Sequence, residues 1–431
     1  MIDVCDELCL SICEDKSSSS ESLEGWWTCL ALFCNITVED SHRTGFLTYL
    51  TNLSVDLNDK KYSNCSTELT FSLKTAMGYA IPINGYISPV LVLLTVINNT
   101  LVCIVLLKPH MRSPTNAILI AMALSDMMTG LFPVPVFIYF YATERVHEWI
   151  PYNWCYVVYV LEEYIPTIFH TASIWLTMAL AIQRYIYVCH SFKARTWCTT
   201  RNVIYGTGAI YLIATLSHAP RFFEHYLIET WRPSKLNHSV MVSACVVDYR
   251  PWIAAHVNTF YSIYYWFRVI FINLIPCVSL VVMNALLIYA MRVARRRRMQ
   301  LLRQNKKSES RKLKESNCTT LMLVTVVGLF LLVEFPLGVL MALLIIKETF
   351  KIQFFAQEMW KALSLFSNLF ILLSYPLNFF IYCGMSKQFR ETFKRLFTGD
   401  EMPKEREYSQ YMTLPTENGK STAVTGDETA L

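Results

Sequence analysis

Seven long apolar stretches constrain this chain more than any other feature of its sequence. They cover roughly residues 80–107, 114–141, 154–188, 202–223, 255–291, 317–346 and 357–384. A helix rises about 1.5 Å per residue and a bilayer's hydrocarbon core is about 30 Å thick, so each stretch can cross a membrane as one helix. Only 16% of the residues are charged and 54% are hydrophobic, which is too apolar for an ordinary soluble protein. The sequence therefore predicts an all-α membrane protein with a bundle of seven transmembrane helices.

The distribution of charge predicts how the helices are oriented. Lys108 and Arg112 follow the first stretch, and residues 292–316, after the fifth, hold 11 Lys or Arg against 2 Glu. Residues 1–78 instead hold 12 Asp or Glu against 5 Lys or Arg. Because basic loops stay in the cytoplasm, we expect a multi-pass plasma-membrane protein with its N-terminus outside.

The basic segment 292–316 has three interpretations. It can be a solvated linker, contact anionic membrane lipid, or dock an intracellular partner. Nucleic-acid binding is not expected, because two membrane spans flank the segment.

The chain divides into four predicted parts. Residues 1–79 form an extracellular glycosylated tail, 80–385 the seven-helix domain, 386–397 an amphipathic eighth helix, and 398–431 a disordered cytoplasmic tail. Four sequons on the predicted outer side are expected to carry glycans: Asn35, Asn52, Asn64 and Asn237. Six cysteines in the first part can form disulfides, but their pairing does not follow from their spacing.

The third stretch is unusual because it carries ionisable residues at membrane depth. Glu162, Glu163, His170 and Arg184 all lie within it. Such groups cost several kcal/mol in lipid unless they face protein or a water-filled cavity. Glu163 and His170 share one helical face, whereas Glu162 is rotated from it by about 100°. This helix is therefore predicted to lie inside the bundle.

The end of the same stretch resembles a known family. Gln183-Arg184-Tyr185 is similar to the acidic-Arg-Tyr motif that closes the third helix of rhodopsin-class G-protein-coupled receptors. The longer string HTASIWLTMALAIQRYIYVCH resembles invertebrate receptors for sex peptide, myoinhibitory peptide, myosuppressin and FMRFamide-like peptides. The resemblance covers about residues 80–397. It implies a cell-surface neuropeptide receptor acting on a heterotrimeric G protein, with Gi/o the coupling that the subgroup suggests and arrestin a further partner.

Motifs in other stretches support the resemblance. Ala123-Leu124-Ser125-Asp126 resembles the family's second-helix signature, and Asn378-Phe379-Phe380-Ile381-Tyr382 its seventh-helix motif, with the proline moved to Pro376. The sixth stretch has Val333-Glu334-Phe335-Pro336 where the family has Cys-Trp-x-Pro, a variant similar to one in the peptide-receptor subgroup.

The resemblance assigns roles to individual residues. A disulfide is expected between Cys155 and Cys245. A polar site that holds water or sodium is expected from Asn99, Asp126, Ser173, Ser374 and Asn378. The alternative for Asp126 is a neutral side chain in a packing hydrogen bond. The activation switch and G-protein contact are expected from Gln183, Arg184, Tyr185, Phe330, Pro336 and Tyr382.

An Arg-Phe-amide peptide is the ligand that the resemblance suggests, and its recognition requires a desolvated carboxylate and aromatic walls. The predicted contacts are Glu162, Glu163, His170, Glu334, Tyr164, Phe267 and Phe366. For each aromatic side chain, ordinary helix packing is the alternative. For Glu334 the alternative is a structural hydrogen bond to His170.

Two local features remain open from the sequence. The 29 residues from Cys155 to Arg184 exceed the family's usual interval by about one turn, so the third helix either extends farther out or contains a bulge near Pro166. The last residues, Thr429-Ala430-Leu431, match a PDZ-domain ligand, although so short a match is often accidental.

Other functional classes fit the sequence less well. Residues 362–384 contain no lysine to hold retinal, and no paired halves suggest a transporter. No Gly-rich phosphate loop, metal-spacing cluster or nucleophile elbow indicates an enzyme, a cofactor or a metal. The strongest competing hypothesis is an orphan seven-helix receptor or scaffold without a peptide agonist.

Overall fold

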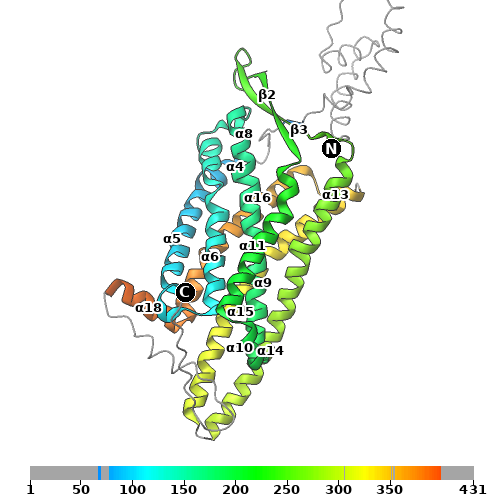
Figure 1. The fold of residues 1–431 in the computed structure, drawn as a ribbon. Helices are drawn as coiled ribbons and strands as arrows, with labels where there is room; N and C mark the ends of the chain where they lie inside the picture. The colour runs from blue at the N-terminus through cyan, green and yellow to red at the C-terminus, as the bar shows by residue number, and fades with distance from the viewer. Residues whose placement is uncertain (1–66, 69–76, 305, 351, 353–354, 399–431) are drawn as a thin grey trace, which may run out of the picture.

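A computed structural model describes residues 67–68, 77–304, 306–350, 352 and 355–398, which form an elongated bundle of helices with a β hairpin at one end (Figure 1). We call this end the hairpin end and the opposite one the α18 end. Among the described residues, six spans are long and apolar enough to cross a membrane: Gly78–Leu106, Pro114–Ala142, Tyr152–Cys189, Thr259–Arg303, Asn317–Lys347 and Met359–Met385. The remaining predicted span is α11 (Thr200–Phe222), which packs on the second and third spans but is less apolar than the other six.

Each span consists of one or more helical segments. The first contains α4 (Met77–Pro82), η1 (Ile83–Ile87) and α5 (Ser88–Leu106), and the second α6 (Pro114–Leu131), α7 (Val134–Val136) and η3 (Phe137–Ala142). The third contains α8 (Tyr152–Val158), η5 (Tyr159–Tyr164) and α9 (Ile165–Cys189). The fifth contains α13 (Val257–Phe267), η6 (Arg268–Leu274) and α14 (Ile275–Arg303). The last elements are α15 (Lys307–Phe350), α16 (Gln357–Ser374), α17 (Leu377–Met385) and α18 (Lys387–Thr398).

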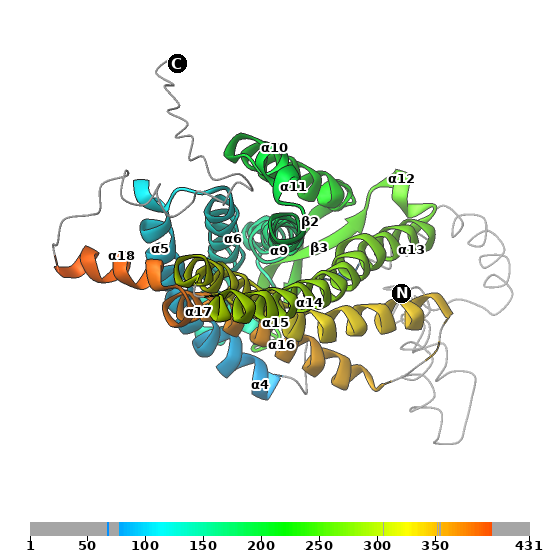
Figure 2. The same cartoon turned by 90° about the horizontal axis from the view of Figure 1, so that it is seen from below.

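Shorter elements connect the spans. They are η2 (Pro109–Met111), η4 (Arg145–His147), α10 (Ser191–Trp197) and α12 (Pro251–Ala254). Seen along the bundle, α9 lies among the other helices rather than at the edge (Figure 2). The third span is therefore the central one, as its ionisable residues predict.

Four π-helical segments in the described part of the chain, η1, η3, η5 and η6, lie next to prolines. Pro89, Pro166 and Pro276 stand in the first turn of the α-helix that follows η1, η5 and η6. Proline cannot donate a backbone hydrogen bond, and its ring clashes with the carbonyl four residues earlier. The wider π turn accommodates both effects. The alternative of a bulge near Pro166 is therefore the one observed, in η5.

The basic segment is helical over most of its length. The apolar stretches predicted as spans end at residue 291 and resume at 317, but α14 continues to Arg303 and α15 begins at Lys307. Arginine, leucine, methionine and glutamine are good helix formers, and the run contains no glycine or proline to end the helix. The positive charges on α14 therefore lie on a rigid extension beyond the bundle.

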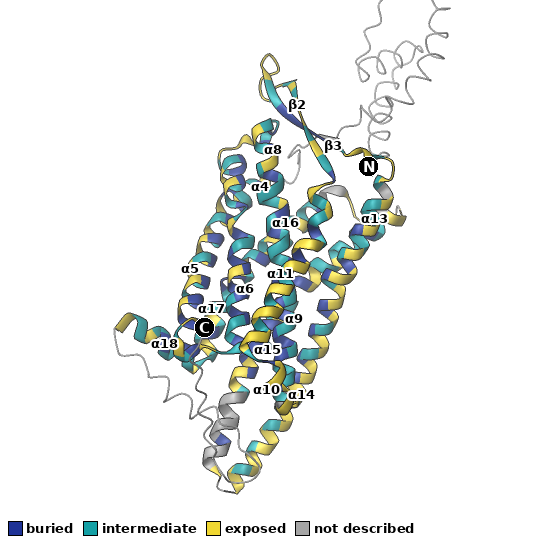
Figure 3. Ribbon diagram, in the orientation of Figure 1, coloured by how far each residue is buried: buried dark blue, intermediate teal, exposed yellow. Residues whose placement is uncertain are grey.

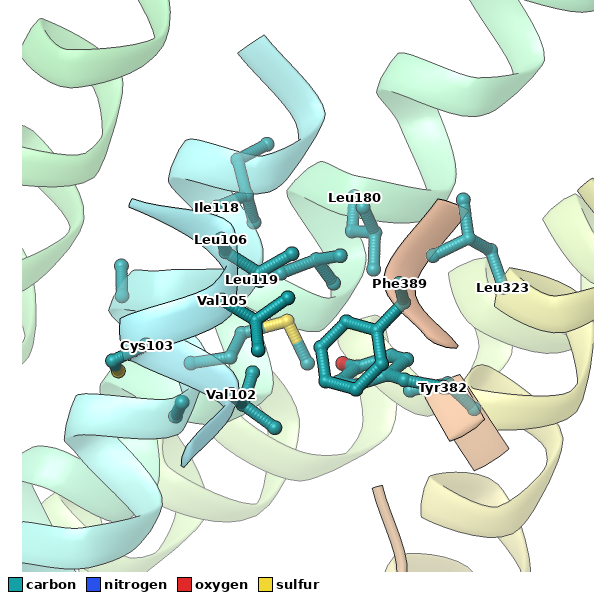
Figure 4. Packing of buried hydrophobic residues seen from close by; sticks show 14 of the residues in the cluster. Val102, Cys103, Val105, Leu106, Ile118, Leu119, Leu180, Leu323, Tyr382 and Phe389 are labelled. Atoms are coloured by element: carbon teal, nitrogen blue, oxygen red, sulfur yellow. The ribbon is translucent and has the colours of Figure 1, made fainter. Parts of the chain in front are cut away.

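Buried and exposed residues alternate along the helices, and many exposed residues lie on the outer faces of the spans (Figure 3). At the α18 end, one apolar cluster joins α5, α6, α9 and α15 to Tyr382 and Phe389 (Figure 4). Phe389 is buried by this cluster, and His110 Nε2 lies 2.9 Å from Thr392 Oγ1. Together these contacts fix α18 against the end of the bundle.

A three-stranded antiparallel sheet covers the hairpin end. Its strand order is β1 (Thr67–Glu68), β3 (Met241–Tyr249) and β2 (His225–Pro233). The predicted disulfide between Cys155 and Cys245 is present and joins α8 to β3, with 6.2 Å between the Cα atoms. A disulfide across a separation of 90 residues holds the hairpin on the central span.

Candidate functional site

A buried polar contact joins three spans at the middle of the bundle. His170 Nε2, on α9, lies 3.4 Å from Glu334 Oε2 on α15. His170 Nδ1 lies 3.2 Å from the hydroxyl of Tyr375, in the turn between α16 and α17. The Glu334 side chain is only 6% exposed. A buried carboxylate requires a partner, and His170 is the partner that the sequence offered as the alternative to a ligand.

A second polar group lies beside it and is also buried. Ser173 Oγ donates to Asp126 Oδ1 at 2.8 Å, and Asn378 Nδ2 donates to Asp126 Oδ2 at 3.4 Å. Asp126, Ser173, Ser374 and Asn378 line a cavity of about 20 Å³ together with Phe330 and Glu334. That volume has room for about one water molecule or a small ion.

Asn99 differs from the other residues predicted for the polar site. Its Nδ2 donates to the Thr95 carbonyl at 3.1 Å, within its own helix. Asn99 is buried but does not line the small cavity. Among the described residues Asn99 thus forms no hydrogen bond with Asp126, and its part in a site that holds water or sodium stays a prediction.

Glu163, a predicted ligand carboxylate, is held by an arginine of the chain itself. Arg221 Nη2, on α11, pairs with Glu163 Oε1, and Arg221 Nε lies 3.1 Å from Glu224 Oε1. Glu224 is fully buried and also lies 3.1 Å from His225 Nδ1. His225 Nε2 is in turn 3.2 Å from the Tyr261 hydroxyl on α13. This ionic network connects the third, fourth and fifth spans to the start of β2.

Glu162 has a different environment from its neighbour. In the described ranges, no hydrogen bond or ion pair holds its carboxylate, which lies near enough to Tyr141 of the second span for an electrostatic interaction. Of the three predicted ligand carboxylates, Glu162 is thus the one that the described chain leaves uncompensated.

The predicted aromatic walls do not form one site. Tyr164 is buried against Phe222, with ring centroids 4.5 Å apart. Phe267 and Phe366 are each 39% exposed, and Phe267 packs against Phe271 with centroids 5.0 Å apart. The structure therefore does not bring these three rings together, and ordinary helix packing describes Tyr164.

The predicted switch residues lie toward the α18 end. Both polar atoms of the buried Gln183 side chain and the Nε of Arg184 lack a hydrogen-bond partner among the described residues. The Arg184 guanidinium lies 5.9 Å from the Tyr187 ring centroid. Among the described residues, no ion pair holds it. Tyr185 packs near His190, with centroids 5.9 Å apart.

The remaining switch residues lie in α15 and α17. Phe330 packs on a small apolar cluster of Ala181, Leu280 and Val327. Pro336 lies within α15, two residues after Glu334. Tyr382 is buried against Phe389, with ring centroids 5.8 Å apart.

Sequence reasoning did not assign roles to several of these partners. Arg221 and Glu224 are spaced three residues apart at the end of the fourth span, a helical ion-pair spacing that could have suggested their pairing. His218 bridges Thr171 at 2.8 Å and Tyr264 at 2.9 Å. Tyr375 and His218 carry no local signal, because their partners lie far away in the chain.

Of the predicted glycosylation sites, Asn237 is exposed in the turn between β2 and β3. Asn35, Asn52 and Asn64 lie outside the described residues, as does the terminal Thr429-Ala430-Leu431. Where side chains are described, no group of three His, Cys, Asp or Glu residues is placed to hold a metal ion.

Comparison with known proteins agrees with this arrangement. Residues 86–400 match the family described as serpentine type 7TM GPCR chemoreceptor Srw. The chain is 42% identical over 359 residues to the sex peptide receptor of Drosophila melanogaster, covering 82% of this chain and 80% of that protein. It is 36% identical over 327 residues to sex peptide receptor-related protein 2 of Caenorhabditis elegans, with coverage of 74% and 72%.

A more distant relative is the FMRFamide receptor of Drosophila melanogaster, 26% identical over 351 residues, which are 78% of this chain and 58% of that protein. All of these relatives are signalling receptors rather than enzymes. With a central span that carries buried charge, a tethered hairpin and matches over most of its length, the chain belongs to the rhodopsin-like seven-transmembrane G-protein-coupled receptors, among the invertebrate neuropeptide receptors.

Proposed function

We propose that this receptor lies in the plasma membrane and detects a secreted peptide of the kind recognised by sex peptide receptors. The observation that carries this proposal is the 42% identity over 82% of the chain, against 26% for the FMRFamide receptor. The hairpin end, with residues 1–79, faces outward. The extension of α14 and residues 398–431 face the cytoplasm, where a Gi/o protein, arrestin and a PDZ domain at Thr429–Leu431 are the proposed partners.

The orientation is supported by the charges and by one sequon. Arg295 to Arg298 extend α14 beyond the bundle, whereas Asn237 is exposed at the opposite end. Basic residues stay on the cytoplasmic side. Glycosidase treatment of receptor from intact cells should lower the apparent mass of the wild type more than that of Asn237→Gln. Equal decreases in the two receptors would contradict the orientation of the hairpin.

The proposed mechanism links the peptide site to the α18 end through α15. Peptide binding at the hairpin end favours a bundle in which α15 bends at Pro336 and its α18-end half moves outward, so that Arg184 meets the G protein. Proline within α15 weakens the helical hydrogen-bond ladder one turn earlier. The peptide can drive this change only by binding the two bundle states with different affinity.

Arg-Phe-amide peptides form a second candidate ligand class. The observation that favours them is Glu162, whose carboxylate has no ionic partner among the described residues and can pair with a ligand guanidinium. We expect Glu162→Gln to raise the half-maximal concentration of such an agonist about tenfold or more while surface expression stays normal. Glu163→Gln serves as the matched control, because Arg221 already occupies that carboxylate.

The test of the main proposal is an agonist panel. Cells expressing the receptor are exposed to sex peptide, myoinhibitory peptides and Arg-Phe-amide peptides, and cyclic AMP is measured with and without pertussis toxin. We expect nanomolar responses to the first two classes that the toxin abolishes. Responses that persist in the toxin would contradict Gi/o coupling alone, and silence toward every peptide would favour an orphan receptor.

A further inference from the structure

Arg184 lies next to a tyrosine of its own helix. Tyr187 follows it by three residues on α9, and the guanidinium lies 5.9 Å from the centroid of the tyrosine ring. Side chains on a helix tilt toward its N-terminus, so a residue three positions later reaches back over the earlier one. An aromatic ring attracts a guanidinium that lies within about 6 Å of its centroid. Tyr187 therefore offers Arg184 an aromatic restraint.

This restraint lies beside the position where the family motif has an acid. Gln183 occupies that position, and both polar atoms of its side chain lack a hydrogen-bond partner among the described residues. The Nε of Arg184 lacks one there as well. The amide of Gln183 thus does not do the work of a carboxylate, and the ring of Tyr187 is the group that faces the guanidinium.

The hydroxyl of the same tyrosine reaches the connection between the third and fourth spans. Tyr187 Oη donates to the carbonyl of Cys198, the buried residue that follows α10, at 3.2 Å. The two preceding carbonyls, of Thr196 and Trp197, accept from Asn202 Nδ2 at 3.3 and 3.2 Å. The last carbonyls of a helix have no partner within it, so these bonds fix the end of α10.

Tyr187 therefore connects two parts of the α18 end. Its ring faces Arg184 and its hydroxyl holds the end of α10, which lies at this end of the bundle (Figure 1). Both groups belong to one rigid side chain, so a displacement of α10 moves the ring away from Arg184 unless the hydrogen bond breaks. Among the natural side chains, phenylalanine would keep only the first contact.

We propose that Tyr187 is a positioning residue that holds Arg184 in the resting receptor through its ring and couples this hold to α10 through its hydroxyl. The inference rests on the proposed role of Arg184 as the contact for the G protein. The hold is weaker than an ion pair, because a cation beside a half-buried ring is attracted less than a guanidinium paired with a carboxylate. A partner that displaces α10 thereby releases Arg184.

The first measurement is nucleotide exchange by G proteins in the absence of agonist. Full-length purified receptor in nanodiscs is mixed with purified heterotrimers from every class of Gα subunit, so the result does not depend on the coupling subtype. Tyr187→Leu removes both contacts and should raise basal exchange about threefold or more. Tyr187→Phe keeps the ring and should raise it less.

The second measurement is hydrogen exchange of α10, which requires no G protein. The backbone N–H groups of Ala194 and Cys198 donate to carbonyls one turn earlier, each at 3.0 Å, and report whether α10 is intact. Exchange at residues 194–198 should be faster than in wild type in both Tyr187→Phe and Tyr187→Leu, and to a similar extent, because both variants lack the hydroxyl.

A change of background separates positioning from damage to packing. In Gln183→Glu receptor the new carboxylate takes over the hold on Arg184, so Tyr187→Leu should no longer raise basal exchange. Damage to packing would act equally in both backgrounds. Tyr205→Leu is the matched control, because this exposed tyrosine of α11 lies beside Arg201, with 5.6 Å between guanidinium and ring centroid. It should leave both measurements unchanged.

The proposal is overturned if Tyr187→Leu leaves basal exchange at the wild-type rate, or if its effect is the same in both backgrounds. It is also overturned if Tyr187→Phe leaves the protection of α10 unchanged. Peptide responses together with wild-type behaviour of these variants remove only the role of Tyr187. The expected variant behaviour without any peptide response removes only the proposed agonist class.

Discussion

Glu334 and His170 face each other across the interior of the bundle, 3.4 Å apart, and join the sixth span to the third. Glu334 stands where the Cys-Trp-x-Pro motif that this segment resembles has a tryptophan, so a polar contact occupies this level of the bundle. His170 also reaches Tyr375, which extends the contact to the seventh span. The pair thus connects the helix that is proposed to move with the third and seventh spans.

Removing one partner of this pair should lower the free energy of unfolding more than removing both partners. We expect His170→Phe to destabilise the receptor by about 3 kcal/mol, because Glu334 is left buried without its partner. The double variant His170→Phe with Glu334→Leu should recover most of that loss. Thermal unfolding of the purified receptor measures both, and losses that simply add would contradict coupling between the two side chains.

The unpaired Arg184 predicts signalling without agonist. Gln183 stands where the family motif has an acid, and among described residues no carboxylate holds the guanidinium. We expect basal signalling above vector control and a several-fold decrease in Gln183→Glu, since the new carboxylate can hold Arg184. Gln183→Asn is the neutral control. Basal activity that is the same in all three receptors would argue against this restraint.

Within the network around Arg221, loss of Arg221 should lower the free energy of unfolding more than loss of the Glu163 charge. Arg221→Met leaves the fully buried Glu224 with His225 alone, so we expect a loss of about 3 kcal/mol in the free energy of unfolding. Glu163 is 47% exposed, and Glu163→Gln should cost less than about 1 kcal/mol. Melting temperatures of the two purified variants check this order, and the reverse order would refute it.

The turn of the hairpin at residues 234–240, which Glu148 holds, should loosen only in strong acid. Partial burial of Glu148 opposes the effect, but hydrogen bonds from Ser234 and from the backbone N–H groups of Lys235 and Trp149 lower the pKa of this carboxyl. Its stabilising contribution is therefore full above the ordinary carboxyl pKa and disappears as the pH falls through the lowered one.

Hydrogen exchange of residues 234–240 over a pH series measures this release. Wild-type protection, corrected for the intrinsic pH dependence of exchange, should persist through mildly acidic conditions and fall only in strong acid. Glu148→Gln should show weaker protection than wild type above the transition, the same protection in strong acid, and no such transition. A wild-type transition near neutral pH would contradict the assignment to Glu148.

The sequence predicts the parts of this receptor that depend on local pattern. The length of the apolar stretches locates the spans. Motif resemblance predicts the disulfide between Cys155 and Cys245 and the contact between Asp126 and Ser173. The pairing of Arg221 with Glu163 could not be predicted, because the two residues are 58 positions apart and their contact depends on how the third and fourth spans are rotated. Apolar length does not predict the continuation of α14 through Arg298, because a run of arginines is not apolar although arginine favours helix.

The π-helical segments η1, η3, η5 and η6 all occupy the half of their span nearest the hairpin, whereas α5, α6, α9 and α14 continue as regular helices toward the other side. One residue gained or lost at such a segment turns the tip beyond it by about 100° and leaves the rest in register. A one-residue insertion or deletion there can therefore change which side chains one span presents at the hairpin end, without rotating the half of that span nearest α18.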